Sequence, residues 1–429
     1  MSEISDPQKP GAASGFSGDR PASAEATGGP KDASKPETIR SVAPGVPQKP
    51  LPKWANQNGQ SNGNGTNGNG NGHEDQHGDM EVLFPHARAH RRMVPEDLLL
   101  VLTYRCNSRC VMCGIWEADQ SGKGELTADE YAKILPDSLL YVNLSGGEAF
   151  LRKDLPQVVE AVRSAAPKAK VTLSTNGLQP RQTKKLLPDI LKHDPGIGFA
   201  ISIDGEEEMH DKVRGIKGGY AKAYETVKIL QAEGVTNLRI AFTATVNTAG
   251  DNTDHLSKIY DLAMKTGVEF TVAVAHNSDH YFKTAANKGV NTEELTRQLN
   301  YVAQKELQST RPKSWLRAYF HHGLVEHARA NVRPTPCEAG HTSFMIDPTG
   351  DVFPCNILDM PVGNVREHSF MDIWKSEEME KARGVVRACN QPCWMVCTAR
   401  ASMRRDRYQV MGWVAKNKVK SHFGSDIIE

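Results

Sequence analysis

The chain has 429 residues, a formal net charge of +1 and eight cysteines. This balance gives no overall attraction to nucleic acid or to an acidic membrane surface. No apolar run approaches the roughly 18 residues that span a membrane, and the N-terminus lacks the basic and apolar regions of a signal peptide. Cysteines without a secretion signal argue against a disulfide scaffold and predict a cytoplasmic protein.

Residues 1–85 form a low-complexity segment rich in Gly, Pro, Ser and Asn, with an Asn/Gly tract at Asn62–Gly72. Such a composition cannot bury enough apolar surface to offset the entropy lost on ordering. We therefore expect a disordered N-terminal tail, with a partner-docking arm as the alternative.

Short β-rich runs alternate with amphipathic helical patterns between residues 95 and 290. Strands interleaved with helices form right-handed βαβ crossovers and a parallel sheet. The units are too few for a closed eightfold barrel, and functional residues of such folds lie where the strands end. The expected strands are Leu98–Thr103, Leu140–Leu144, Lys170–Ser174, Gly198–Ile203, Leu238–Thr245 and Glu269–Ala275.

Three cysteines, Cys106, Cys110 and Cys113, follow the first strand with the spacing C-x3-C-x2-C. Three thiolates are one fewer than a [4Fe–4S] cube needs, so one iron would keep an open position. A closed zinc site has four ligands, which usually arrive as two cysteine pairs. The spacing favours an iron–sulfur cluster, and a zinc site or unligated cysteines are the alternatives.

C-x3-C-x2-C after a strand resembles the signature of the radical SAM superfamily. The resemblance implies an open, partial (β/α)6 TIM-like barrel whose cluster binds S-adenosylmethionine through its open iron. Reductive cleavage then gives a 5′-deoxyadenosyl radical, which abstracts a hydrogen atom from the substrate. In the family an aromatic residue that packs on the adenine often precedes the third cysteine. Here that residue is Met112, whose thioether can pack in a similar way.

The segments after later strands carry further similarities to this family. Gly146, Gly147 and Glu148 resemble its motif that contacts the amino group of S-adenosylmethionine, although a plain turn is the alternative. The resemblance also implies cofactor contacts from Ser174 and Asn176, for which an ordinary turn is the alternative. It implies further contacts from Ser202, Asp204 and Arg214, for which a capped helix start with a surface ion pair is the alternative.

Polar side chains also follow the sixth expected strand. His276, Asp279, His280 and Tyr281 would crowd the mouth of the barrel. We expect them to contact the substrate, or to supply the base that removes a proton after hydrogen abstraction. An exposed polar loop is the alternative. Residues 291–333 then predict a helical bridge.

A second cysteine set lies in residues 334–400 and starts with a predicted β-hairpin, Phe344–Pro354. A hairpin with a cysteine at each base, followed by further cysteines, is a plausible cage of four thiolates, with zinc as the alternative metal. Cys337, Gly350 and Cys355 resemble the start of a SPASM auxiliary-cluster domain, in which Cys, nine to fifteen residues, Gly, four residues and Cys follow one another.

The end of this region departs from the full SPASM pattern. The chain has only C-x3-C-x3-C, formed by Cys389, Cys393 and Cys397. Five thiolates fill one four-ligand cage with one left over, so we predict a single auxiliary [4Fe–4S] cluster in a shortened SPASM or "twitch" arrangement. Cys337 and Cys355 would join two of the last three cysteines, and the spacing does not decide which two.

The segment 401–429 is basic and predicts either a solvated helix face or a docking surface for an electron donor of the flavodoxin or ferredoxin type. As a whole, the resemblance implies a radical SAM oxidoreductase. A small-molecule substrate such as a sugar, aminocyclitol or lipid precursor is the first expectation, because the N-terminal segment is no folded leader-peptide-binding domain. Peptide modification is the second, and a non-catalytic zinc protein is the alternative from another class.

Overall fold

The computed structural model describes residues 93–248, 253–330, 332–389, 393–423 and 426–428. The expected N-terminal tail lies outside these ranges. The described strands form one nine-stranded sheet in the order β6-β5-β4-β3-β2-β1-β7-β8-β9, which is open because β6 and β9 are its two edges. The prediction of an α/β fold with an open, partial barrel is confirmed.

Six parallel strands make up the first part of the sheet, and their positions agree with the sequence pattern to within a few residues. All five residues of β1 are buried, as expected for a strand covered on both faces, whereas β5 alternates between buried and half-buried positions. The strands are β1 (Asp97–Val101), β2 (Tyr141–Ser145), β3 (Lys170–Thr175), β4 (Gly198–Ser202), β5 (Leu238–Ala244) and β6 (Glu269–Val274).

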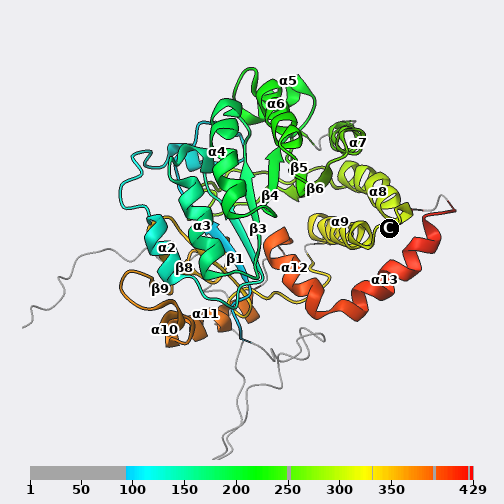
Figure 1. The fold of residues 1–429 in the computed structure, drawn as a ribbon. Helices are drawn as coiled ribbons and strands as arrows, with labels where there is room; N and C mark the ends of the chain where they lie inside the picture. Colours follow the sequence, from blue (N-terminus) through cyan, green and yellow to red (C-terminus); the bar gives the residue numbers. More distant parts are fainter. Residues whose placement is uncertain (1–92, 249–252, 331, 390–392, 424–425, 429) are drawn as a thin grey trace, which may run out of the picture. The chain divides into compact units, whose positions relative to one another are not determined.

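Helices connect these strands and pack their apolar faces on the sheet (Figure 1). In α3, for example, Leu155, Val158, Val159 and Val162 recur at helical spacing and are fully buried. The connecting helices are α2 (Ala128–Ile134), α3 (Leu155–Ala165), α4 (Pro180–His193), α5 (Glu207–Arg214), α6 (Gly219–Ala232) and α7 (His255–Thr266), with short 3₁₀ turns η2 (Ile115–Glu117) and η3 (Ala149–Leu151).

The predicted hairpin is present, but it belongs to the same sheet. Strand β7 (Ser343–Ile346) pairs in parallel with β1, from Asp97 opposite Ser343 to Leu100 opposite Ile346. Strands β8 (Asp351–Phe353) and β9 (Gly363–Asn364) follow in antiparallel pairing. The region of the second cysteine set is therefore hydrogen-bonded to the first strand of the barrel.

Helices α8 (Thr292–Gln308) and α9 (Pro312–Ala330) form the bridge and pack against each other. Gly323 on α9 lets Trp394 approach closely, since a Cβ at Gly323 would stand 2.3 Å from the indole ring. The indole nitrogen of Trp394 also donates to the carbonyl of Phe320 at 2.9 Å. The chain that follows Cys393 is thus fixed to the bridge.

Four helices complete the described chain: α10 (Phe370–Trp374), α11 (Glu377–Arg387), α12 (Val396–Arg405) and α13 (Arg407–Lys420). No helix among the described residues is long and apolar enough to cross a lipid bilayer.

The arginines of α12 bind to the start of β1. Arg400 and Arg404 both pair with Asp97, at 3.0 and 2.8 Å, and both lie over the ring of Tyr141. Arg405 pairs with Glu338 at 2.5 Å. The expectation of a solvated basic face for residues 401–429 is wrong for Arg404 and Arg405, because buried carboxylates distant in sequence attract them.

We expect Asp97→Ala to lower the free energy of unfolding by about 3 kcal/mol. The Asp97 side chain is 1% exposed, and its loss leaves two partly buried guanidinium groups short of their partner. The matched control is Glu377→Ala, which breaks an exposed ion pair with Lys381 and should cost less than about 0.5 kcal/mol. Urea unfolding measures both. Equal effects of the two substitutions would contradict a structural role for the Asp97 pairs.

Candidate active site

The first cysteine loop lies across the end of α5. The backbone N–H of Arg109 donates to the carbonyl of Arg214 at 3.0 Å, and that of Val111 donates to the carbonyl of Val213 at 2.9 Å. The hydroxyl of Ser108 donates to the same Arg214 carbonyl at 3.0 Å. These backbone contacts hold Cys106–Cys113 beside the carboxyl ends of the parallel strands.

The end of β2 touches the start of this loop so closely that only glycine fits. The N–H of Gly147 donates to the carbonyl of Thr103 at 2.8 Å, and that of Glu148 donates to the carbonyl of Arg105 at 2.8 Å. A Cβ at Gly147 would stand 2.2 Å from the Arg105 carbonyl oxygen and 3.0 Å from the Cβ of Cys106. The expected Gly-Gly-Glu motif and the cysteine loop are therefore one structural unit.

Glu148 has a fully buried carboxylate that organises the next strand end. It accepts hydrogen bonds from the N–H of Asn176 and the hydroxyl of Thr175, both at 2.8 Å, and from the N–H of Phe150 at 3.0 Å. Burial raises the pKa of Glu148, and these hydrogen bonds oppose the shift. Asn176 in turn donates to the side chain of Asn107 in the cysteine loop at 2.8 Å.

Arg214 and Asp204 form a buried pair instead of a surface one. The Arg214 Nε donates to Asp204 at 2.5 Å, and the other Asp204 oxygen accepts from the N–H of Thr243 at 2.7 Å. The Arg214 Nη1 lies 3.6 Å from the sulfur of Cys110. A cation thus stands beside one of the three thiols, and it stabilises negative charge there.

Of the remaining expected cofactor contacts, Ser174 and Ser202 lie at strand ends and Met112 lies in the cysteine loop. The hydroxyl of Ser174 donates to Asn143 at 3.1 Å, and Ser202 is half-buried at the end of β4. Met112 is buried, and its carbonyl accepts from Asn287 at 3.0 Å.

The four residues expected to meet substrate have different surroundings. Tyr281 is buried, with its hydroxyl 3.0 Å from that of Ser145. The ring of His280 stacks on Phe353 at 4.5 Å, and Asp279 is exposed. The His276 ring lies 4.9 Å from that of His327, and burial lowers the pKa of His276 to about 3.

The thiols of the first set lie near enough to affect one another's protonation. Burial raises the pKa of Cys106 to about 12, and the neighbouring thiols of Cys110 and Cys113 act in the same direction. Burial raises the pKa of Cys113 to about 11, against the effect of Arg214. Ligation would replace these protons with iron. No three His, Cys, Asp or Glu side chains in the described ranges form a group able to hold a single metal ion.

The second set of cysteines gathers around the base of the hairpin. The buried sulfur of Cys355 accepts from the N–H of Leu358 at 3.2 Å, and Cys337 and Cys389 pack in the same apolar cluster. Burial raises the pKa of Cys393 to about 12, Arg333 opposes the shift, and the thiols of Cys337, Cys389 and Cys397 add to it. Cys397 and Cys355 also line one small cavity of about 10 Å³.

Arg333 is half-buried among these cysteines. Its guanidinium donates to the carbonyl of Cys393 and lies 3.8 Å from the Cys393 sulfur. It also lies 5.2 Å from the ring centre of Trp394 and donates to Ser402 at 3.2 Å. Burial lowers the pKa of Arg333, but the thiols of Cys337 and Cys393 outweigh this and raise it.

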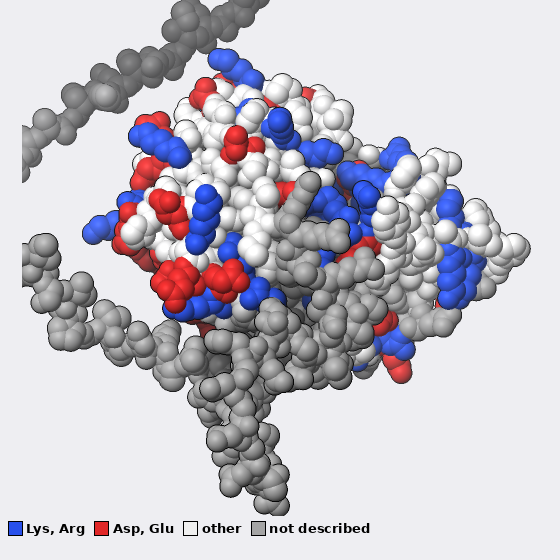
Figure 2. Space-filling model, turned by 90° about the horizontal axis from the view of Figure 1, so that it is seen from below, with Lys and Arg blue, Asp and Glu red and all other residues white. Residues whose placement is uncertain are grey.

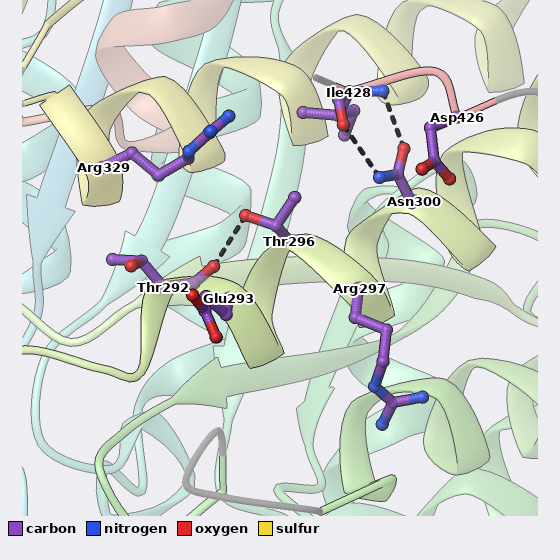
Figure 3. A pocket seen from close by; sticks show the side chains of 8 residues that line it. All are labelled: Thr292, Glu293, Thr296, Arg297, Asn300, Arg329, Asp426 and Ile428. Atoms are coloured by element: carbon purple, nitrogen blue, oxygen red, sulfur yellow. Dashed lines mark hydrogen bonds between the residues drawn. The ribbon is translucent and has the colours of Figure 1, made fainter.

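A larger cavity, of about 390 Å³, lies away from both cysteine sets. Figure 3 shows it between α8, the end of α9 and the C-terminal residues. Asn300 and Ile428 hydrogen-bond across it, and Arg297 is paired with Asp254 and Glu294. It contains no cysteine and adds nothing to the site at the strand ends.

Two family models match this chain. The radical SAM superfamily model covers residues 100–263, and the SPASM iron–sulfur cluster-binding domain model covers residues 337–398. The chain belongs to the radical SAM superfamily. The radical SAM domain implies a [4Fe–4S] cluster and S-adenosylmethionine, and the SPASM domain implies auxiliary iron–sulfur chemistry.

Several curated relatives match about two thirds of this radical SAM protein. The AdoMet-dependent heme synthase of Methanosarcina barkeri is 29% identical over 66% of this chain and 83% of its own. The sporulation killing factor maturation protein SkfB of Bacillus subtilis is 27% identical over 65% of each chain, so the chain spans just under two thirds of SkfB. The solved structure of Streptococcus suis SuiB bound to S-adenosylmethionine matches with a TM-score of 0.53, 18% identity and 68% coverage of both chains.

Three features of this radical SAM site leave no motif in the sequence. Arg333 precedes Cys337 without any recognisable spacing rule, and Ser145 contacts Tyr281 from a strand 136 residues away. The N–H of Gly114 donates to the carbonyl of Phe282 at 2.8 Å. This last contact uses backbone atoms, so side-chain identity cannot signal it.

We expect Gly147→Ala to prevent assembly of the first cluster and to reduce S-adenosylmethionine cleavage by at least about tenfold, because the new Cβ forces the cysteine loop off the end of β2. Iron content and 5′-deoxyadenosine release measure the effect. The control is Gly384→Ala on α11, where the nearest atom would be 3.9 Å away. Wild-type iron content and cleavage in the Gly147 variant would refute the close approach as a requirement.

Proposed function

We propose that this radical SAM enzyme is an oxidoreductase that abstracts a hydrogen atom from a peptide substrate, assisted by one auxiliary [4Fe–4S] cluster. The observation that carries the peptide assignment is the recurrence of peptide maturation among relatives matched over two thirds of the chain. Besides SkfB, these include the mycofactocin maturase MftC of Mycobacterium tuberculosis, 26% identical over 66% of this chain and 71% of its own, and the PqqA peptide cyclase of Methylocella silvestris, 26% identical over 70% and 79%.

The fold neighbours support the same assignment, since SuiB is also known bound to its precursor peptide SuiA, with a TM-score of 0.52. The first expectation from sequence, a sugar, aminocyclitol or lipid precursor, receives less support than the peptide alternative. A tetrapyrrole is the second candidate, because the matched heme synthase is 29% identical over 83% of its own length.

We assign the first cluster to Cys106, Cys110 and Cys113. When bound, the cluster supplies the electron that cleaves S-adenosylmethionine. Around it, the chain offers Gly146 and Gly147 for close approach, the buried Glu148 carboxylate for an amino group and the Arg214 guanidinium for a carboxylate. The other proposed cofactor contacts are Met112, Ser174, Asn176, Ser202 and Asp204.

We assign the auxiliary cluster to Cys337, Cys355 and Cys393, with the fourth ligand from Cys389 or Cys397. We include Cys393 because the thiols of Cys337, Cys389 and Cys397 raise its pKa. The Cys393 thiol in turn raises the pKa of Cys355, so it lies near all four. His276, Asp279, His280 and Tyr281 remain candidates for substrate contact or proton transfer. Since burial holds the pKa of His276 low and that of Tyr281 high, a neutral imidazole and a neutral phenol are the forms available at pH 7.

We expect the anaerobically reconstituted protein to contain about eight irons per chain and to release 5′-deoxyadenosine with dithionite. Replacing Cys106, Cys110 and Cys113 with Ala should leave about four irons and abolish the release. Iron, acid-labile sulfide and product analysis measure this. Cleavage in the triple variant would overturn the assignment of the first cluster, and zinc in place of iron would overturn the auxiliary one.

The substrate class can be tested with the low-mass fraction of an extract from the source organism. We expect this fraction to stimulate 5′-deoxyadenosine release severalfold, and pretreatment of the fraction with proteinase to remove the stimulation. A stimulation that survives proteinase and is reproduced by an iron porphyrin would instead identify a tetrapyrrole substrate.

We expect Arg333→Met to lower the midpoint potential of the auxiliary cluster by about 100 mV, because a half-buried cation near the ligands favours the more negative, reduced cluster. EPR redox titration in the Cys106/Cys110/Cys113→Ala background isolates this cluster.

Arg333→Lys should restore most of the potential. The control is Arg383→Met, which also removes an arginine stacked on a tryptophan, Trp374, but should shift the potential little. An unchanged potential in Arg333→Met would contradict the electrostatic role.

A further inference from the structure

Helix α13 has an inner face that packs on the bridge. Val410, Val414 and Asn417 are buried, and the ring of Trp413 lies 5.4 Å from that of Tyr319 and 5.0 Å from that of His322 on α9. Figure 1 shows α13 running along the outside of the molecule beside α9. The orientation of the helix is therefore fixed, and its other face points to solvent.

That outer face carries an unusual apolar stripe. Tyr408 is 78% exposed, Met411 49%, Val419 62% and Phe423, just past the helix end, 79%. Their spacing keeps them on one side of a helix with 3.6 residues per turn, opposite the buried face. Tyr408, Val419 and Phe423 are the most exposed large apolar side chains among the described residues. A helix that packs by one face normally presents polar side chains here.

The stripe has basic borders. Residues 407–423 contain no Asp or Glu. At about 100° per residue, Arg407 and Lys418 fall along one border of the stripe and Lys416 and Lys420 along the other. Lys418 also donates to the Leu307 carbonyl at 2.7 Å and so anchors the helix to α8. Figure 2 shows basic side chains beside uncharged surface on this side of the molecule.

We propose that α13 docks the enzyme on an anionic lipid surface. The stripe would enter the boundary between headgroups and acyl chains, and the exposed side chains of Arg407 and Lys416 would meet the phosphates. The near-neutral charge of the whole chain does not oppose this, because the attraction is local to the helix.

The charge pattern favours lipid over a second copy of the chain. Pairing two α13 helices through their stripes would bring basic borders together, and the segment has no acidic residue to neutralise them. The surface is also one convex helix, which suits a flat lipid interface. Docking of this kind goes beyond the proposed reaction and is independent of the substrate.

The test is co-sedimentation of the full chain with vesicles of phosphatidylcholine containing 30% phosphatidylglycerol. We expect binding that falls at least about tenfold in Tyr408→Ser/Val419→Ser/Phe423→Ser, and also about tenfold in Arg407→Gln/Lys416→Gln or with pure phosphatidylcholine vesicles. The matched control is Met264→Ser/Met371→Ser, which removes exposed apolar side chains, 43% and 39% exposed, from α7 and α10. This control should bind like the wild type.

Because all substituted side chains are exposed, the variants should keep the wild-type melting temperature, which circular dichroism checks. Equal vesicle binding by wild type and stripe variant would overturn the proposal. It would also be overturned if the wild type did not bind vesicles but was a dimer by light scattering that the stripe substitutions dissociate.

Discussion

The pairing of β1 with two neighbours is the constraint on which the rest of the structure depends. On one side it pairs with β2, which ends in the glycines that touch the first cysteine loop. On the other side it pairs with β7, which leads into the hairpin of the second cysteine set. Since β1 itself leads into the first loop, both iron–sulfur regions of this radical SAM protein are attached to one backbone ladder.

The ends of β1 differ in their electrostatics. At its start, the carboxylate of Asp97 holds two arginines of α12 and thereby fixes the helix that begins beside Cys397. Past its other end, Arg214 lies beside Cys110. In the second cysteine set, Arg333 lies beside Cys393 as Arg214 lies beside Cys110 in the first. Each cysteine set therefore has a guanidinium at hydrogen-bond range, buried for Arg214 and half-buried for Arg333. Each guanidinium offsets part of the negative charge that thiolate ligation of iron accumulates.

Much of this arrangement could be predicted from the sequence, because local patterns determine it. The β-rich runs and the helical periodicity between them predicted the six parallel strands. The cysteine spacing and Gly-Gly-Glu pointed to the family. What could not be predicted depends on contacts between distant segments. Neither the β1–β7 pairing nor the place of Arg333 leaves a periodic signal.

Burial also affects the interpretation of two residues that the sequence analysis proposed as substrate contacts. His280 and Tyr281 follow β6 as expected, yet they pack against Phe353 and Ser145 because the hairpin covers that end of the sheet. A pattern of polar residues after a strand cannot distinguish a ligand contact from a packed loop when the covering element comes later in the chain.

The parallel β1–β7 ladder has a consequence for dissecting the molecule. A fragment ending before Cys337 would strip β1 of one partner and expose a fully apolar strand, Leu98–Val101, as a new sheet edge. Such edges recruit strands from other chains. Truncation would thus yield an aggregation-prone half instead of a free-standing barrel, so the regions are better separated functionally by cysteine substitution than physically by cutting the chain.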